Sequence, residues 1–301
     1  MKDVLITGGA GKIGFDLVKK LVDTNCNITI LDLESKASVR KLASIKDKVR
    51  IVYGDVEDAD LVRDLVKRND VVIDYAGIVP PLADLNEGIA NATNFNGTKN
   101  IVDAINELNP DCVYIYMSFI CVYGSTSKKV RKLSIESEST YPDDYYSVSI
   151  IRSEDYIKSN LKRYSIMRMP IVLTENNYFI KHMKLDRTMD FITKEDLNDI
   201  VLATMKSNKI FGKTYNISGF KAKGREVIKK LYDATGEISI LNRNIYYGEY
   251  EDNSEIDKIV KIKYTTLAEF IEDSMRNIPK FRRTMRKLLN SIKYLIFTKL
   301  K

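Results

Sequence analysis

The chain has 301 residues, of which 44% are hydrophobic and 30% charged, an ordinary globular composition that excludes wholesale disorder. Its net charge of +7 arises at the C-terminus, because residues 276–301 contain nine Lys or Arg and no acidic residue. The rest of the chain is nearly neutral, which excludes a general nucleic-acid surface, and we expect no nucleic acid as a partner.

The remaining composition points to a reducing compartment and away from metal chemistry. The N-terminus runs directly into a strand-like segment and no apolar run approaches about 18 residues, so we expect neither a signal peptide nor a transmembrane helix. Three cysteines far apart in the sequence exclude a disulfide scaffold or a zinc ribbon. The single histidine, His182, argues against a histidine-based metal site. We therefore expect a cytoplasmic protein that holds no metal.

Strand-like and helical patterns alternate through the first part of the chain. The apolar segments predict strands at 4–7, 28–33, 49–53, 71–74, 113–117 and 164–169. The periodic segments between them predict helices that include 12–24, 86–108 and 144–161. This alternation predicts an α/β fold with a doubly wound parallel sheet that helices cover on both faces. After Pro170 the pattern loosens into short pieces, which we interpret as a smaller lobe.

A glycine-rich segment, TGGAGKIG, joins the first predicted strand to the first helix. A dinucleotide pyrophosphate needs such a junction, because glycines allow a tight turn and a close backbone approach while the helix N-terminus offers free N–H groups. The residues that we assign to this contact are Gly8, Gly11, Lys12, Ile13 and Gly14. A side chain at Gly11 is expected to occupy the path of the pyrophosphate. The alternative is a glycine-rich turn without a ligand.

Asp32 stands at the end of the second predicted strand, roughly 20 residues after the loop, where dinucleotide sites carry an acidic residue. A carboxylate here accepts hydrogen bonds from the adenosine ribose hydroxyls and repels a 2′-phosphate. The sequence therefore predicts NAD as the cofactor in preference to NADP. An ordinary loop aspartate is the alternative interpretation.

The spacing TGxxGxxG resembles the extended branch of the short-chain dehydrogenase/reductase superfamily, the NAD-dependent sugar-nucleotide epimerases and dehydratases. Further segments resemble the family's motifs in the family's order: GDV at 54–56, YAG at 75–77, NFNGT at 94–98, VYG at 122–124, RMP at 168–170, DFI at 190–192 and YNISG at 215–219. The resemblance covers about residues 1–275. It implies a Rossmann-like NAD-binding domain at 1–170 and a small substrate lobe at 171–275, interleaved with the first domain.

The same resemblance implies further cofactor contacts. In the family, the acidic residue after the third strand meets the adenine, and the loop after the fourth strand lies along the cofactor. The residues of this chain that match these positions and the following helix motif are Asp55, Val56, Tyr75, Ala76, Gly77 and Asn94.

Enzymes of this family use a Tyr, a Lys four residues later, and a Ser or Thr. Positions i and i+4 of a helix face the same side, so the Lys cation lowers the pKa of the phenol, which takes a proton while hydride leaves for the nicotinamide. Tyr146 stands at the Tyr position, but Ile150 stands at the Lys position and Phe119 at the Ser/Thr position. None of the 18 tyrosines has a Lys four residues later. Two of the three catalytic groups are therefore missing.

The missing groups predict weak or absent Tyr-dependent turnover. A phenol with its ordinary pKa is about one part in a thousand ionised at pH 7, and apolar neighbours raise that pKa further. The leading interpretation is an NAD-binding family member with a degenerate centre, acting near nucleotide-sugar or surface-glycan metabolism. The alternatives are an active epimerase, dehydratase or reductase in which Tyr146 has an unconventional helper, and a non-catalytic NAD-responsive scaffold at a membrane. Met189 stands where the family usually has an Arg that clamps the nucleotide-sugar diphosphate, so the sequence allows this substrate without demanding it.

The C-terminal segment, 276–301, predicts a basic amphipathic helix. Its apolar residues recur at helical spacing: Phe281, Met285, Leu288, Leu289, Ile292, Leu295 and Ile296. Basic residues stand largely between them, which suits peripheral contact with the anionic inner face of a membrane. The alternatives are packing on the body of the protein or against a second copy in a homodimer, and, against the near-neutral charge of the body, a nucleic acid.

Overall fold

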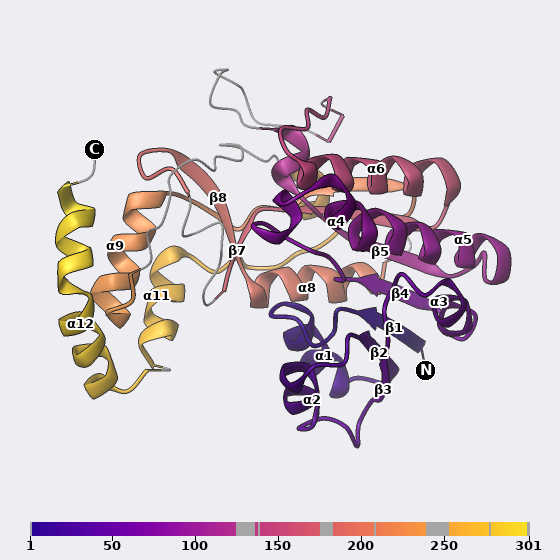
Figure 1. Cartoon of the computed structure of the whole chain (residues 1–301), viewed down its shortest axis with the longest axis horizontal. Coiled ribbons are helices and arrows are strands. Elements are labelled where there is room, and N and C mark those ends of the chain that lie inside the picture. The colour runs from indigo at the N-terminus through magenta and orange to yellow at the C-terminus, as the bar shows by residue number, and fades with distance from the viewer. Residues whose placement is uncertain are drawn as a thin grey trace.

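The structure, a computed structural model, describes residues 2–124, 136–137, 139–174, 183–207, 209–238, 253–276 and 278–299. His182 lies outside these ranges, as do the last two residues of the tail. The described strands form two sheets. Figure 1 shows the larger sheet with its helices on the right and a smaller lobe, which carries the C-terminal helix, on the left.

The larger sheet has seven parallel strands in the order β3-β2-β1-β4-β5-β6-β9. Their bounds are β1 Lys2–Thr7, β2 Cys26–Asp32, β3 Arg50–Tyr53, β4 Val71–Asp74, β5 Val113–Phe119, β6 Tyr164–Met169 and β9 Lys213–Asn216. Because the strand order changes direction between β1 and β4, the topology is that of a doubly wound, Rossmann-like sheet. The predicted fold class is confirmed, and all six predicted strands are present.

Side chains that alternate along β1 divide the core between the two faces of this sheet. The covering helices are α1 Gly14–Val22, α2 Lys36–Leu42, α3 Ala59–Val66, α5 Thr98–Leu108, α6 Tyr145–Asn160 and α8 Lys194–Met205. Val4 and Ile6 pack with apolar residues of α1, α2 and α8 on one face. Leu5 packs with α3, α5 and α6 on the other face. Burial on both faces explains why these strands are continuously apolar.

The single long helix predicted at 86–108 is divided into three parts. It begins as α4 (Glu87–Asn91), widens into a π-helical stretch, η2 (Ala92–Gly97), and continues as α5. Such bulges re-aim side chains and occur often at functional sites. Here the bulge contains Asn94, whose side chain is bonded to the loop after β4.

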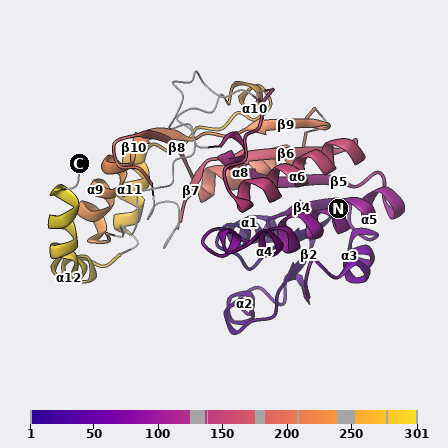
Figure 2. The ribbon, with the colours of Figure 1, turned by 45° about the horizontal axis from the view of Figure 1, so that its top comes forward.

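The smaller lobe is built on a three-stranded sheet in the order β10-β8-β7. Its elements are β7 Ile171–Leu173, β8 Thr188–Thr193, β10 Phe220–Lys223, α9 Gly224–Thr235, α11 Leu267–Arg276 and α12 Lys280–Lys299. Three short helices lie elsewhere in the fold: η1 Leu82–Asp84, η3 Ile120–Tyr123 and α10 Ser254–Asp257. The chain after Pro170 serves both sheets, because α8 and β9 belong to the larger one (Figure 2). No helix within the described ranges is both long and apolar enough to cross a membrane.

Candidate functional site

The glycine loop between β1 and α1 is folded tightly against itself and against the chain that follows β4. Gly8 has a φ of +66°, and a Cβ atom there would lie 2.7 Å from the carbonyl group of Tyr75. A Cβ at Gly14 would lie 2.5 Å from the Gly8 oxygen, and one at Gly11 would lie 2.9 Å from the same atom. The nearest obstacle to a side chain at Gly11 is thus the loop's own backbone, before any ligand is considered. The shape of the loop itself requires these glycines.

The loop leads into a helix N-terminus that suits an anion. Helix α1 begins at Gly14 after Ile13, and no side-chain hydrogen bond caps its first turn. Uncapped N–H groups and the positive end of the helix dipole favour a phosphate group. The exposed Lys12 adds a cation to the same turn. These residues, together with a loop that excludes side chains, fit a dinucleotide pyrophosphate.

Asp32, at the end of β2, and Lys41, in α2, both form hydrogen bonds with the glycine loop. Asp32 Oδ2 accepts a hydrogen bond of 2.7 Å from the Ala10 amide. Lys41 Nζ donates to the carbonyl oxygens of Ala10 (2.9 Å) and Gly11 (2.6 Å) and lies 4.8 Å from the centre of the Phe15 ring. Burial raises the pKa of the Asp32 carboxyl above its ordinary value, although the amide bonds and the Lys41 cation oppose this shift. Sequence reasoning missed Lys41, because no motif surrounds this residue in α2.

The turn after β3 lies beside Asp32. The Gly54 amide donates to the main-chain oxygen of Asp32 at 3.0 Å, which holds the ends of β2 and β3 together. The Asp55 carboxylate accepts a hydrogen bond of 3.0 Å from the Glu57 amide within the turn. Val56 is buried, and a Cβ at Gly97 would lie only 2.5 Å from its Cγ2 atom. Asp55 and Val56, which the sequence predicts to contact the adenine, therefore lie at the same sheet edge as Asp32.

Tyr75 and Ala76 follow β4 and border the glycine loop through their main chain. The Ala76 amide donates to Thr7 Oγ1 at 3.3 Å, at the end of β1. The phenol of Tyr75 does not lie at the sheet edge. Its hydroxyl instead donates to Asn198 Oδ1 of α8 at 3.0 Å. Only the main chain of Tyr75, which abuts Gly8, is thus placed where the sequence predicted a cofactor contact.

Asn94 joins the loop after β4 to helix α6. Its Oδ1 atom accepts from the Ile78 amide at 2.7 Å, and its Nδ2 atom donates to the Ile78 oxygen and to Ser149 Oγ, both at 3.0 Å. A Cβ at Gly77 would lie 3.2 Å from Asn94 Oδ1. Since Asn94 is buried and its amide makes these three bonds, its role here is to position the loop.

Tyr146, Phe119 and Ile150 come together in one apolar core, and we refer to them as the Tyr146 cluster. Their exposed fractions are 5%, 3% and 5%, and the rings of Phe119 and Tyr146 are 6.1 Å apart at 50°. Burial is the largest of the causes that raise the pKa of Tyr146 well above its ordinary value. The two positions at which the family has polar catalytic groups are therefore apolar and buried beside the phenol.

Two polar side chains near the altered positions in sequence, Ser118 on β5 and Arg152 on α6, make their contacts away from the Tyr146 phenol. Ser118 Oγ donates to Glu154 Oε1 at 2.6 Å, within a polar network that does not include the Phe119 ring. The Arg152 guanidinium lies 4.2 Å from the centre of the Phe95 ring and 3.9 Å from a Glu87 carboxylate oxygen. Both positions agree with the alternation along a strand and the rotation along a helix.

A buried ion pair fixes α6 against the sheet two turns after Tyr146. Glu154 accepts from Arg168 Nε at 2.9 Å and from Arg168 Nη2 at 2.6 Å, and Lys158 Nζ donates to it at 2.8 Å. Arg168 Nη1 also donates to the Tyr123 hydroxyl at 2.7 Å. Burial alone would raise the pKa of Glu154, but its cationic partners hold that pKa below its ordinary value. The network ties α6, β5 and β6 together.

Two carboxyl groups near Tyr146 act in the opposite sense to the missing Lys. Asp144 caps α6, where its side chain accepts from the Ser147 amide at 2.7 Å. Burial, assisted by the charge of Asp144, raises the pKa of Asp84 to about 6. Both carboxylates raise the pKa of the Tyr146 phenol further, after burial and the effects of other neighbours. They therefore disfavour the phenolate that the family's chemistry requires.

The substrate side of the lobe lacks the family's clamp at its expected position. Met189, which stands where the family has an Arg, is fully buried in the apolar core of the lobe. The next residue, Asp190, accepts from Ser218 Oγ at 2.5 Å, and Lys221 Nζ lies 3.8 Å from it. Within the described ranges, no group of three His, Cys, Asp or Glu side chains is placed to hold a metal ion.

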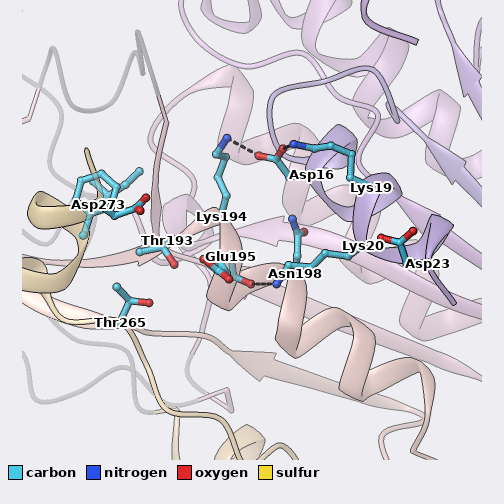
Figure 3. A pocket seen from close by; sticks show the side chains of 12 residues that line it. Asp16, Lys19, Lys20, Asp23, Thr193, Lys194, Glu195, Asn198, Thr265 and Asp273 are labelled. Carbon is cyan, nitrogen blue, oxygen red and sulfur yellow. Dashed lines mark hydrogen bonds and ion pairs between the residues drawn. The ribbon is translucent and has the colours of Figure 1, made fainter. Parts of the chain in front are cut away.

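A hollow of about 430 Å³ lies between α1, α8 and α11, on the side of Asn198 (Figure 3). Charged side chains on one side of it form ion pairs: Lys194 pairs with Asp16, which also pairs with Lys19 at 2.6 Å. Asn198 Nδ2 is buried at this wall, and no described residue accepts a hydrogen bond from it. The Tyr146 cluster does not line the hollow.

The sheet edge at which β1, β2 and β4 end thus provides the loop, the helix end and the carboxylate of a dinucleotide site, and the protein is of the Rossmann-type dinucleotide-binding class. A comparison with family models narrows this class. Residues 4–179 match the model of the NAD dependent epimerase/dehydratase family, and the chain belongs to that family. The resemblance inferred from the sequence motifs is confirmed.

Two curated relatives carry names from sugar and glycan biosynthesis. The chain is 32% identical over 180 residues to dTDP-glucose 4,6-dehydratase of Mycobacterium tuberculosis, an overlap that covers 58% of this chain and 53% of that protein. The chain thus spans about half the length of this relative. It is also 28% identical over 264 residues to the low-salt glycan biosynthesis protein Agl12 of Haloferax volcanii, covering 78% of this chain and 83% of that one.

Solved structures share the fold. DesIV, a dTDP-glucose 4,6-dehydratase of Streptomyces venezuelae solved with NAD and TYD, superposes with a TM-score of 0.79 at 18% identity, covering 91% of this chain and 96% of that one. WbmH of Bordetella bronchiseptica, solved with NAD⁺, has a TM-score of 0.78 at 21% identity and covers 94% and 99%. At these identities the likeness establishes the fold alone.

Proposed function

We propose that the protein binds NAD at the glycine loop and a nucleotide sugar beside it, around a centre that does not support Tyr-dependent proton transfer. The observation that carries this proposal is the Tyr146 cluster, in which an apolar ring and an apolar chain stand where the chemistry needs a hydroxyl and a cation. Membership of the family and the name of the first relative support the substrate class. In this proposal residues 1–170 bind NAD and 171–275 bind the substrate.

The cofactor contacts in this proposal follow the sheet edge. The pyrophosphate lies at the N-terminus of α1, which has no side-chain cap, and the Asp32 carboxylate accepts from the adenosine ribose. NAD, when bound, supplies a hydride acceptor. The residues that we assign to the site are Gly8, Gly11, Lys12, Ile13, Gly14, Asp32, Asp55, Val56, Tyr75, Ala76, Gly77 and Asn94, to which we add Lys41 as a residue that fixes the loop.

Proton transfer is the step that this arrangement impedes. A buried phenol whose pKa lies well above its ordinary value keeps its proton at neutral pH and can donate a hydrogen bond to a substrate oxygen. It is a poor base, and the nearby carboxylates make it a poorer one. Binding without efficient turnover is the expected behaviour, and it opposes the alternative of an active enzyme with a helper for Tyr146.

We also propose a place of action at the cytoplasmic face of a membrane, with peripheral contact through helix α12. This proposal shares its membrane contact with the alternative of a non-catalytic scaffold. The exposure of the apolar residues of α12 favours that contact. The name of the Haloferax volcanii relative supports a glycan pathway. A homodimer stays a prediction.

Wild-type protein tests the catalytic part of the proposal. We expect NAD to bind with preference over NADP in calorimetry, and we expect little conversion of dTDP-glucose or UDP-glucuronic acid in the presence of NAD. Tyr146→Phe should then leave the weak residual rate unchanged. Robust wild-type turnover that Tyr146→Phe abolishes would show that the centre works without its Lys.

A gain-of-function pair complements this test. Ile150→Lys restores a cation one helical turn from Tyr146, and Phe119→Ser restores a hydroxyl, and because such groups act as a unit, neither change alone should suffice. The double variant should gain on the order of 10²-fold in turnover, the usual contribution of a positioned acid or base. Thermal unfolding must accompany the assay, since a Lys at position 150 places a charge in an apolar core.

A further inference from the structure

Helix α12 packs on the lobe through a side that is mostly polar. Tyr294 stacks on Tyr232 of α9, with ring centres 3.8 Å apart and planes 9° from parallel. Asn290 Nδ2 donates to the Gly236 oxygen at 3.0 Å, and the Tyr232 hydroxyl donates to the Lys287 oxygen at 3.2 Å. These contacts fix which side of the helix faces the protein.

Gly236, which ends α9, makes this close approach feasible. It has a φ of +73°, and a Cβ atom there would lie 2.5 Å from the Lys287 nitrogen and 2.7 Å from the Arg283 oxygen. The main chain of α12 therefore rests directly on a glycine, which leaves the helix little freedom to rotate.

The apolar side of α12 faces away from the protein. The seven residues of this apolar stripe have exposed fractions between 42% and 75%, and they are Phe281, Met285, Leu288, Leu289, Ile292, Leu295 and Ile296. At about 100° per residue they span roughly 120° of the helix and lie about opposite to Asn290 and Tyr294. A continuous apolar surface of this kind, left uncovered by the fold, marks an interaction site.

The charge of the helix selects the partner. Within α12, seven Lys or Arg occur and no acidic residue. On the helical wheel, Arg282, Arg286 and Lys293 follow one border of the apolar stripe, while Lys280 and Lys287 follow the other. Two copies of such a helix would bring like charges together, whereas anionic head groups would meet cations on both borders while the stripe enters the acyl layer.

We infer that the apolar stripe of α12 is the docking surface for an anionic lipid leaflet, in which the helix lies flat. This inference rests on the proposed membrane contact and names its lipid class and its inserted residues. In Figure 1 the helix lies at the far left, beyond α9 and away from the larger sheet. A membrane on that side leaves the glycine loop in water, open to a water-soluble cofactor and nucleotide sugar.

Vesicle flotation of the full chain tests the inference with two matched double variants. Leu289→Glu with Ile292→Glu places two charges in the stripe, and both side chains are more than 70% exposed, so the fold should tolerate them. Ser291→Glu with Thr298→Glu adds the same charge on exposed polar positions of the same helix. NAD affinity, measured by calorimetry, serves as the check that every variant is folded.

We expect the wild-type chain to bind vesicles of 70% phosphatidylcholine and 30% phosphatidylglycerol. Loss of one Lys or Arg near the membrane surface should weaken this binding about fivefold, because each such cation contributes about 1 kcal/mol. The stripe variant should lose more than tenfold and the control variant clearly less, with NAD affinity unchanged in both. Equal binding to pure phosphatidylcholine would overturn the anionic leaflet but leave the membrane contact. A failure to bind either vesicle overturns both, and a concentration-dependent dimer that the stripe variant abolishes would assign the stripe to a second copy. None of these outcomes bears on the proposed catalytic centre.

Discussion

Replacing Glu154 by Gln should destabilise the protein strongly although the side chain keeps its shape. The side chains of Glu154 and Arg168 are 1% and 2% exposed, and Arg168 donates two hydrogen bonds to the carboxylate. Gln removes the negative charge and leaves the Arg168 guanidinium buried and uncompensated, which typically costs 3–5 kcal/mol, or about a third to a half of the stability of an ordinary domain. Asp155→Asn, an exposed change on the same helix, should stay within about 0.5 kcal/mol of wild type.

Urea unfolding followed by circular dichroism measures this difference. A double variant, Glu154→Met with Arg168→Met, removes both charges and should be more stable than Glu154→Gln, because an apolar pair of similar volume often replaces a buried ion pair without loss. If Glu154→Gln matched Asp155→Asn within about 1 kcal/mol, Arg168 would have another source of compensation. The assignment of the ion pair as the anchor of α6 beneath Tyr146 would then be refuted.

Two further predictions concern the loop and the carboxyl pair. Gly8→Ala should weaken NAD binding at least tenfold in calorimetry, because the new Cβ meets the Tyr75 carbonyl. Gly212→Ala, at a φ of +71° where a Cβ would lie in ordinary contact, 3.5 Å from the Lys162 oxygen, should cost stability and leave NAD affinity intact. Asp84→Asn should stabilise the protein at pH 7 to 8 but not near pH 4. The folded pKa of Asp84, about 6, lies above the unfolded value, so wild-type stability falls as pH rises from about 4 to about 6. Because Asp84 is only partly buried and water still reaches and screens its carboxyl group, we expect about 1 kcal/mol by thermal unfolding, well below the full shift. Equal effects at both pH values would contradict the shift.

The larger sheet was predictable because its elements carry local signals. Buried parallel strands are short apolar runs, and the glycines of 8–14 stand where a strand must turn at once into a helix. The cofactor candidates follow from the same signals, since parallel strands end at one edge and bring Asp32, Asp55 and Tyr75 to it. Lys41 could not be found in this way. Its contact with the loop depends on the position of α2 on the sheet. A single Lys in a short helix forms no sequence motif from which this contact could be predicted.

The lobe and the tail were less accessible to sequence reasoning. β9 and β10 are separated by only three residues, yet β9 pairs with β6 in the larger sheet and β10 with β8 in the lobe. Such pairing is non-local and has no signature in either segment. For α12, periodicity predicted the apolar stripe but not its direction. The Tyr232–Tyr294 stack and the bare main chain of Gly236 decide which side of the helix is covered, and both join residues that lie far apart in the sequence.

In the proposed function, cofactor binding and proton transfer depend on separate parts of the fold, so a change at one does not by itself remove the other. The glycine loop, Asp32 and Asp55 follow β1, β2 and β3, and their hydrogen bonds are made with one another, with Lys41 of α2 and with Glu57. The Tyr146 cluster belongs to β5 and α6, and it is held by apolar packing above the Glu154–Arg168 pair. A Lys at position 150 would need neighbours that stabilise its charge, whereas Ile is satisfied by the apolar core. Ile150 therefore fits the apolar core around Tyr146, and its packing requires no contact with the glycine loop.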